Sequence, residues 1–298
     1  MPSLFDPHVI ARIEGMTLRS RRLVEGYMAG MHRSRLRGMS TEFAQHRPYV
    51  QGDDPRHLDW KAYAKSDRYY IKEHESETNL RCMFCIDSSH SMFFKSREAA
   101  MSKFEYAATV VASLSYLLMT QKDSFGLVMF DDKVRAAWPC RSSGGHFLNV
   151  VDVLEGAEPG GQTNIARALA AVAPQMRRKG LVVVVSDFVD DPESFNLSMA
   201  RLIYAGHDMV LYHIEDPVER DFPFGGQTIF LGLEGEGKLL CEAADLREAY
   251  LRERGHHVEV LRDMGRRMAF DVEEMPTDEA LDVALSAFFA YRNRRQRL

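Results

Sequence analysis

The chain has 298 residues, of which 45% are hydrophobic and 27% are charged. This length and mixture are typical of a soluble globular protein with one large domain, or with a domain and an extension. The formal net charge of -5 argues against a dedicated nucleic-acid binder, because such a protein carries a basic domain. Asp6, Arg12 and Glu14 interrupt the N-terminus, and no run of about eighteen apolar residues follows. We therefore expect a cytoplasmic protein without a signal peptide or transmembrane segment.

The chain is expected to begin with a helix. Asp6 is a suitable N-cap, Pro7 is a suitable first helical residue, and apolar residues recur on one face over residues 9–16. The helical continuation over residues 19–37 is rich in arginine. Such a run is usually a solvated face, and the alternative is a docking surface for an acidic partner.

The next two segments are charged. Residues 47–60 predict a turn at Gly52 and Asp53, followed by a short helix with Pro55 in its first turn. Residues 70–77 alternate with period two and predict a strand with three glutamates, Glu73, Glu75 and Glu77, on one face. Like charges in that arrangement repel unless they are paired or exposed. Either Arg47 or Arg56 neutralises this row, or the strand is an exposed polar edge.

The remainder of the chain alternates between strands and helices. Apolar runs predict buried strands, and a capping pattern beginning at Ser102 predicts a helix with one apolar face. This alternation is typical of a doubly wound α/β fold, with a mostly parallel sheet and helices on both faces, here preceded by an N-terminal extension. The expected strands are residues 82–87, 125–130, 134–138, 181–186 and 209–214, and the expected helices are residues 147–154 and 165–172.

Several features of these elements have structural interpretations. Asp131 and Asp132 are expected only to form the turn between two strands. After a hairpin across residues 235–237, a charged helix over residues 245–255 would leave His256 and His257 at a solvated helix end. Thr277 is expected to cap the closing helix, whose basic tail complements the helix dipole.

The four cysteines are Cys82, Cys85, Cys140 and Cys241. They fit a reducing compartment better than a disulfide framework. The Cys-x-x-Cys pair formed by Cys82 and Cys85 also suggests a redox or zinc site. Residues three apart in a strand point to opposite faces, however, so we expect both thiols to pack in the core.

Oxygen-bearing side chains follow two of the predicted strands and precede one helix. Asp87, Ser89 and Ser91 are spaced two apart where the strand over residues 82–87 ends, Thr163 follows a Gly-Gly turn, and Asp187 ends the strand over residues 181–186. In an open parallel sheet, ligands bind outside the carboxyl ends of the strands, so these loops can converge. Carboxylate and hydroxyl oxygens suit a hard cation such as Mg²⁺, with Mn²⁺ and Ca²⁺ as alternatives. If no metal binds, the serines only cap a helix.

These motifs together resemble the metal-ion-dependent adhesion site of a von Willebrand factor A domain. In that family, the site holds a divalent cation directly or through water and leaves one coordination position for a partner's carboxylate. The resemblance rests on Asp87-x-Ser89-x-Ser91, on Gly160-Gly161-x-Thr163 followed by Ala168-Leu169, and on Ser186-Asp187. It implies that the metal ligands are Asp87, Ser89, Ser91, Thr163 and Asp187.

A second pattern precedes this domain and resembles a bacterial family, domain of unknown function number fifty-eight. In that family, an Arg-x-Tyr-x-x-Gly-Asp-x-x-Arg-x-x-Asp-Trp pattern precedes an A-type domain. The resemblance implies an extension over residues 1–78 and a von Willebrand factor A-like domain over residues 79–298. It also implies an adaptor whose partner is a MoxR-type AAA+ ATPase or its client. The matching residues are Arg47, Tyr49, Gly52, Asp53, Arg56, Asp59 and Trp60.

Enzyme interpretations are less consistent with the motifs. A haloacid-dehalogenase-type phosphatase carries a second acid where this chain has Ser89, and a serine hydrolase would need a Gly-x-Ser-x-Gly elbow. No P-loop motif is present. We therefore expect a non-enzymatic interaction protein that docks through a cation. The alternatives are a metal-independent structural or regulatory scaffold and a metal-dependent phosphohydrolase.

Overall fold

The computed structural model describes residues 6–11, 15–35, 46–48, 63, 69–72, 80–233 and 237–295. The chain divides into two compact units, one formed by Met1–Met28 with Leu80–Leu298 and the other by Ala29–Asn79. In the described part of the smaller unit, β1 (His46–Pro48) pairs antiparallel with β2 (Tyr70–Lys72), so the strand predicted from residue 70 does begin there. The other residues of the second signature, from Tyr49 to Trp60, and the glutamate row lie outside the described residues.

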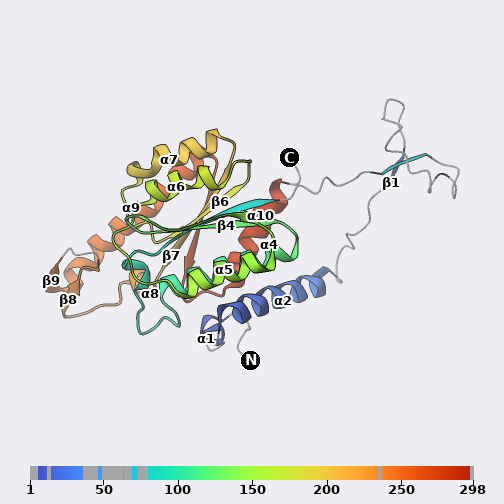
Figure 1. Cartoon of the computed structure of the whole chain (residues 1–298). Helices are drawn as coiled ribbons and strands as arrows, with labels where there is room; N and C mark the ends of the chain where they lie inside the picture. The colour runs from blue at the N-terminus through green and yellow to red at the C-terminus, as the bar shows by residue number, and fades with distance from the viewer. Residues whose placement is uncertain are drawn as a thin grey trace. The chain divides into compact units, whose positions relative to one another are not determined.

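The larger unit is built on a central sheet, which has six strands in the described part of the chain (Figure 1). Its order is β10-β7-β6-β3-β4-β5, and every neighbouring pair is parallel except β4 with β5. The chain runs from β3 to β4 on one side and later adds β6 on the other, so the strand order reverses beside β3. The strands are β3 (Arg81–Asp87), β4 (Ser124–Phe130), β5 (Val134–Arg141), β6 (Leu181–Ser186), β7 (Asp208–Glu215) and β10 (Asp271–Pro276).

Helices cover both faces of this sheet, which explains why its central strands are apolar throughout. One face packs on α4, α5 and α10, and the other packs on α6, α7 and α9. The predicted mostly parallel sheet with helices on both faces is therefore confirmed. The helices are α4 (Lys103–Thr120), α5 (Gly144–Glu155), α6 (Ile165–Gln175), α7 (Pro192–Tyr204), α9 (Ala243–Met268) and α10 (Asp282–Arg295).

Strand β3 illustrates how the sequence alternates between the two cores. Cys82 packs in the cluster on the α4 side, and Cys85 packs in the cluster on the α6 side. Both thiols are fully buried and free. The structure therefore confirms that this Cys-x-x-Cys pair is core packing.

The N-terminal helix differs from the prediction because it is interrupted. Asp6 caps α1 (Pro7–Ile10) as expected, and its carboxylate accepts a 2.8 Å hydrogen bond from the amide of His8. The helix ends at Ile10, and α2 (Met16–Arg35) begins anew after Gly15, whose φ of +77° is a left-handed conformation that favours glycine.

The last third of the chain required three corrections. Helix α9 continues to Met268, so His257 lies partly buried in the middle of a helix and not at a solvated end. Thr277 does not cap the closing helix, which begins at Asp282; its amide instead donates to the carbonyl of Glu215. Strand β10 was not expected. The predicted hairpin is present as β8 (Gln227–Leu231) and β9 (Lys238–Glu242), and α8 (Pro217–Asp221) precedes it.

None of the described helices is long and apolar enough to cross a membrane.

Candidate metal centre

The side chains predicted to bind a cation meet at the carboxyl edge of the sheet. Asp87 is the last residue of β3, Asp187 directly follows β6, and Thr163 lies just before α6. One carboxylate oxygen of Asp87, Oδ2, accepts a hydrogen bond of 3.1 Å from the Thr163 hydroxyl. It also accepts one of 2.6 Å from the hydroxyl of Ser186. The three separate loops therefore converge on one carboxylate, at the place where the strand order reverses.

The two serines of the Asp-x-Ser-x-Ser loop complete this group. The amide of Ser89 donates to Oδ1 of Asp87 at 2.8 Å, which folds the loop back over the end of β3. The hydroxyls of Ser89 and Ser91 lie 3.1 Å apart, and the Ser91 hydroxyl hydrogen-bonds the carboxylate of Asp187. All five predicted residues are thus joined in one chain of hydrogen bonds.

The loop also contains a serine with a different role. Ser88 turns its hydroxyl to the carbonyl of Phe130 at 2.9 Å, and its amide donates to the same carbonyl at 2.6 Å. Ser88 therefore continues the contact between β3 and β4, while Ser89 and Ser91 face the site.

The electrostatics of the site centre on Asp87. Its side chain is completely buried, and burial followed by the negative charge of Asp187 raises its pKa to about 7, against the opposing hydrogen bonds from Ser186 and Ser89. Among the described residues, its carboxylate contacts hydroxyls and one backbone amide, and no basic side chain pairs with it. A buried carboxylate without a counter-charge is costly, so this one is suited to receive a cation.

Asp187 has a counter-charge that the sequence analysis missed. The ammonium group of Lys103, at the first position of α4, lies 2.8 Å from Oδ2 of Asp187 and 2.7 Å from Oε1 of Glu219. Burial alone would raise the pKa of Asp187, but the charge and hydrogen bond of Lys103 outweigh it and lower that pKa. A lysine in the first turn of a helix ordinarily points to solvent, so the sequence did not indicate that Lys103 is buried. Its position next to the capping Ser102 was the only feature that marked it.

The Gly-Gly turn that carries Thr163 is held by Asp131. This buried carboxylate accepts hydrogen bonds from the amides of Gly161 at 2.8 Å and Lys133 at 2.9 Å, and it forms an ion pair with Arg135. Burial raises its pKa, but these partners outweigh burial and hold it at about 2. A Cβ on Gly160 would lie 2.1 Å from the Asp131 carboxylate, so only glycine fits there. Asp131 does form the predicted turn, and it also supports the site.

As metal ligands, the five residues fit a hard divalent cation, because they offer two carboxylates and three hydroxyls. Such oxygen ligands are the ones that Mg²⁺ and Ca²⁺ prefer. In the described part of the chain, no group of three or more His, Cys, Asp and Glu side chains could hold a metal. Any cation here would therefore depend on the hydroxyls for part of its coordination.

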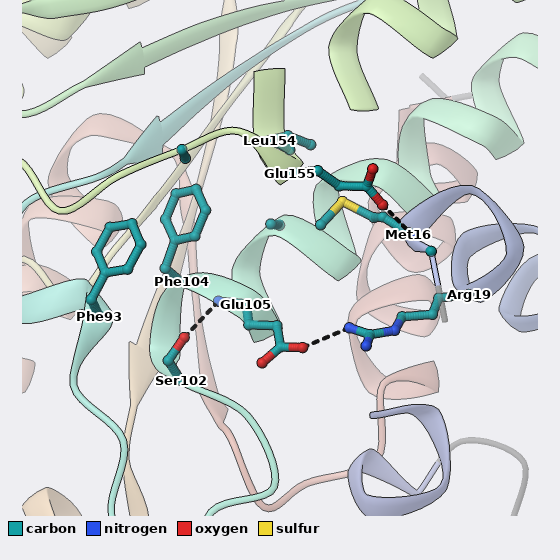
Figure 2. A pocket seen from close by; sticks show the side chains of 11 residues that line it. Met16, Arg19, Phe93, Ser102, Phe104, Glu105, Leu154 and Glu155 are labelled. Atoms are coloured by element: carbon teal, nitrogen blue, oxygen red, sulfur yellow. Dashed lines mark hydrogen bonds and ion pairs between the residues drawn. The ribbon is translucent and has the colours of Figure 1, made fainter. Parts of the chain in front are cut away.

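A separate pocket lies beside the start of α4 and contains none of the five residues. It has a volume of about 320 Å³. Figure 2 shows its stacked Phe93 and Phe104 rings and the ion pair of Arg19 with Glu105, whose atoms lie 2.7 Å apart. Arg19 is therefore not part of a solvated basic face, since it ties the N-terminal helix to α4.

Comparison with known proteins places the chain in a family. The chain matches the family described as "Protein of unknown function DUF58" over residues 45–260, which is more than half of its length. The chain belongs to this family. The matched range spans the second signature, so the predicted resemblance to this family is confirmed. Relatives of this DUF58 protein include uncharacterized proteins of Mycobacterium tuberculosis and Mycobacterium bovis, each 24% identical over 232 residues, or 77% of this chain and 72% of theirs.

Solved structures were also similar to the DUF58 chain. The conserved hypothetical protein BatB from Bacteroides thetaiotaomicron is 14% identical, with a TM-score of 0.49, over 73% of this chain and 98% of its own. The SpRpn10 VWA domain is 14% identical, with a TM-score of 0.42, over 69% of this chain and 93% of its own. The fold assignment itself rests on the strand order and register described above.

Proposed function

We propose that this DUF58 protein is a non-enzymatic interaction module that docks a partner through a divalent cation. The observation that carries the proposal is the buried carboxyl of Asp87, which is surrounded by neutral donors and has no basic partner among the described residues. Mg²⁺ is the first candidate cation, with Mn²⁺ and Ca²⁺ as alternatives. Its ligands would be Asp87, Ser89, Ser91, Thr163 and Asp187.

The bound cation would supply a positive charge with an open coordination position. A carboxylate from a partner protein would fill that position, so docking would need the metal, the loop geometry and the carboxylate together. The family resemblance suggests a MoxR-type AAA+ ATPase or its client as the partner. The four free thiols suit a reducing compartment, and the proposal therefore places the protein in the cytoplasm.

The first test is a calorimetric titration of the metal-stripped protein with Mg²⁺ and with Mn²⁺. We expect saturable binding that is lost in Asp87→Ala and retained in Asp132→Ala, which removes an exposed carboxylate from the turn between β4 and β5. A MoxR-type ATPase should then be retained by the immobilised protein with Mg²⁺ and released by a chelator. Metal binding that survives Asp87→Ala would contradict the proposed site.

One observation favours a second candidate, a metal-independent scaffold. Lys103 already gives Asp187 a cationic partner, so part of the site's negative charge is neutralised without a metal. In that case the partner would bind equally well with and without chelator, and Asp87→Ala would not weaken it.

A further inference from the structure

Lys103 is the one buried cation in contact with the candidate metal centre among the described residues. Its side chain is 1% exposed. Lysine is almost never buried without a partner, and the partners of Lys103 are Asp187 and Glu219. Ser102 caps α4 by accepting a hydrogen bond from the amide of Glu105, and this fixes the first turn in which Lys103 lies. The lysine therefore reaches inward from a rigid position.

The ammonium group is also held from its far side. Glu219 accepts from it with Oε1 and uses Oε2 to accept a 3.0 Å hydrogen bond from the amide of Asp216. Asp216 in turn caps α8 and accepts a 2.9 Å hydrogen bond from the amide of Ser96. This capping box and its contact with the loop before α4 keep Glu219 in place, so Lys103 has a fixed partner on each side.

The position of Lys103 changes the charge available to a cation. Asp187 uses Oδ2 for Lys103 and Oδ1 for the amide of Val189, at 3.3 Å. Of the two predicted ligand carboxylates, Asp87 is then the one without a cationic partner among the described residues. A divalent cation entering the site would meet one uncompensated carboxylate and a nearby ammonium group of the same sign, and charges of the same sign repel strongly where water is excluded.

We propose that Lys103 couples binding of the cation to binding of a partner's carboxylate. This inference rests on the proposed function. The ammonium group of Lys103 weakens binding of the metal alone. A partner's Asp or Glu supplies a negative charge in place of the Asp187 charge that Lys103 neutralises. Metal and carboxylate then bind cooperatively, and by linkage each strengthens the binding of the other to the same degree. Lys103 is thus a positioning residue that couples the two binding events.

The test is a titration with Mn²⁺ followed by electron paramagnetic resonance, with acetate as the carboxylate probe. Lys103→Met removes the charge and keeps an unbranched side chain, so it should bind Mn²⁺ at least tenfold more tightly than the unmodified protein. Lys103→Arg keeps the charge and should bind weakly. Acetate should strengthen Mn²⁺ binding by the unmodified protein more than by Lys103→Met.

A double variant separates the position of the charge from the net charge. Lys103→Met combined with Glu219→Gln leaves the net charge unchanged, so tighter Mn²⁺ binding by this variant must come from removing the ammonium from Asp187. Lys103→Gln gives a second uncharged side chain if Lys103→Met does not fold. Asp87→Ala in the Lys103→Met background should abolish the gain.

The possible failures are distinguishable. Equal Mn²⁺ binding by the unmodified protein, Lys103→Met and the double variant, all lost with Asp87→Ala, would overturn the role of Lys103 and leave the proposed metal site standing. Absence of Mn²⁺ binding by every folded variant, with and without acetate, would overturn the metal site and this inference together.

Discussion

Two buried aspartates at the ends of neighbouring strands have opposite surroundings. Asp131 follows β4 and is paired with Arg135 and two backbone amides, which lower its pKa to about 2. Asp87 ends β3 and has hydroxyls and one amide as partners, and its pKa is raised to about 7. Both side chains are fully buried.

The difference separates a structural carboxylate from one available for binding. The charge of Asp131 is already neutralised by Arg135 and stabilised by two backbone amides. Asp87 is held in place by neutral donors and remains without a counter-charge in the described structure. Burial alone therefore does not identify the binding residue, and the identity of the hydrogen-bond donors does.

The largest effect on stability is expected for Asp131→Ala. This change removes the ion pair with the partly exposed Arg135 and leaves the amides of Gly161 and Lys133 without their acceptor, so it should lower the free energy of unfolding by about 3 kcal/mol. Urea denaturation measures the loss. Asp132→Ala, at the exposed neighbouring position, is the control and should change stability by less than about 0.5 kcal/mol. Equal effects would mean that the turn, and not the buried contacts, matters.

The next largest effect should distinguish Asp87 by its dependence on pH. In metal-free native protein Asp87 keeps its proton up to about pH 7, whereas the unfolded chain releases it near a pKa of about 3.9. The native state binds more protons at Asp87 in between, so the contribution of Asp87 to stability should fall as pH rises from about 4 to 7 and then level off. Asp87→Asn lacks this loss and should be more stable than the unmodified protein at pH 8.

The gain in stability of Asp87→Asn at pH 8 is expected to be about 2 kcal/mol. This is less than the full pKa shift implies, because an amide nitrogen in place of Oδ2 could not accept the hydrogen bonds from Thr163 and Ser186. Urea denaturation with a chelator at pH 5 and pH 8 measures it. Addition of Mg²⁺ at pH 8 should stabilise the unmodified protein and leave Asp87→Asn unchanged. A pH-independent difference between the two proteins would show that Asp87 does not carry the buried charge.

Gly160→Ala should act on both regions. The added Cβ would lie 2.1 Å from the Asp131 carboxylate, while one on Gly161 would lie 3.0 Å from the exposed Asp132 side chain. Overpacking of this kind costs about 1–3 kcal/mol, so we expect a loss of about 2 kcal/mol for Gly160→Ala and a smaller one for Gly161→Ala. Thermal denaturation of the two variants compares them directly. A larger loss for Gly161→Ala would contradict the described turn.

The sequence predicted the parts of the fold that depend on apolar patterning. Strands β3, β4, β6 and β7 are buried on both faces and are therefore recognisable as apolar runs. Strand β10 was missed because it is an edge strand with the sequence Asp-Val-Glu-Glu-Met-Pro, whose charges conceal it. Helix α9 was cut short at Gly255, since a glycine followed by two histidines is typical of a helix end.

For the site, the sequence predicted which side chains would meet but not their charges. Asp87 ends β3 and Asp187 follows the adjacent parallel strand β6, so their convergence was foreseeable from the motif order. The pairing of Lys103 with Asp187 depends on where α4 packs, which spacing along the chain does not reveal. Asp131 was predicted only as a turn residue because its contact with the Gly161 amide joins two segments that are distant in sequence, whereas Lys133 and Arg135 lie within the same turn and strand.

The smallest effect tests the two roles within the Asp-x-Ser-x-Ser loop. Ser88→Ala removes one hydrogen bond to the Phe130 carbonyl, which still accepts from the amide of residue 88, so stability should fall by about 1 kcal/mol with Mg²⁺ binding unchanged. Ser89→Ala should instead weaken Mg²⁺ binding about tenfold, because its hydroxyl is a proposed ligand. Calorimetry and urea denaturation on both variants separate binding from stability. If Ser88→Ala weakened Mg²⁺ binding as much as Ser89→Ala, the alternation of structural and ligand positions along the loop would be wrong.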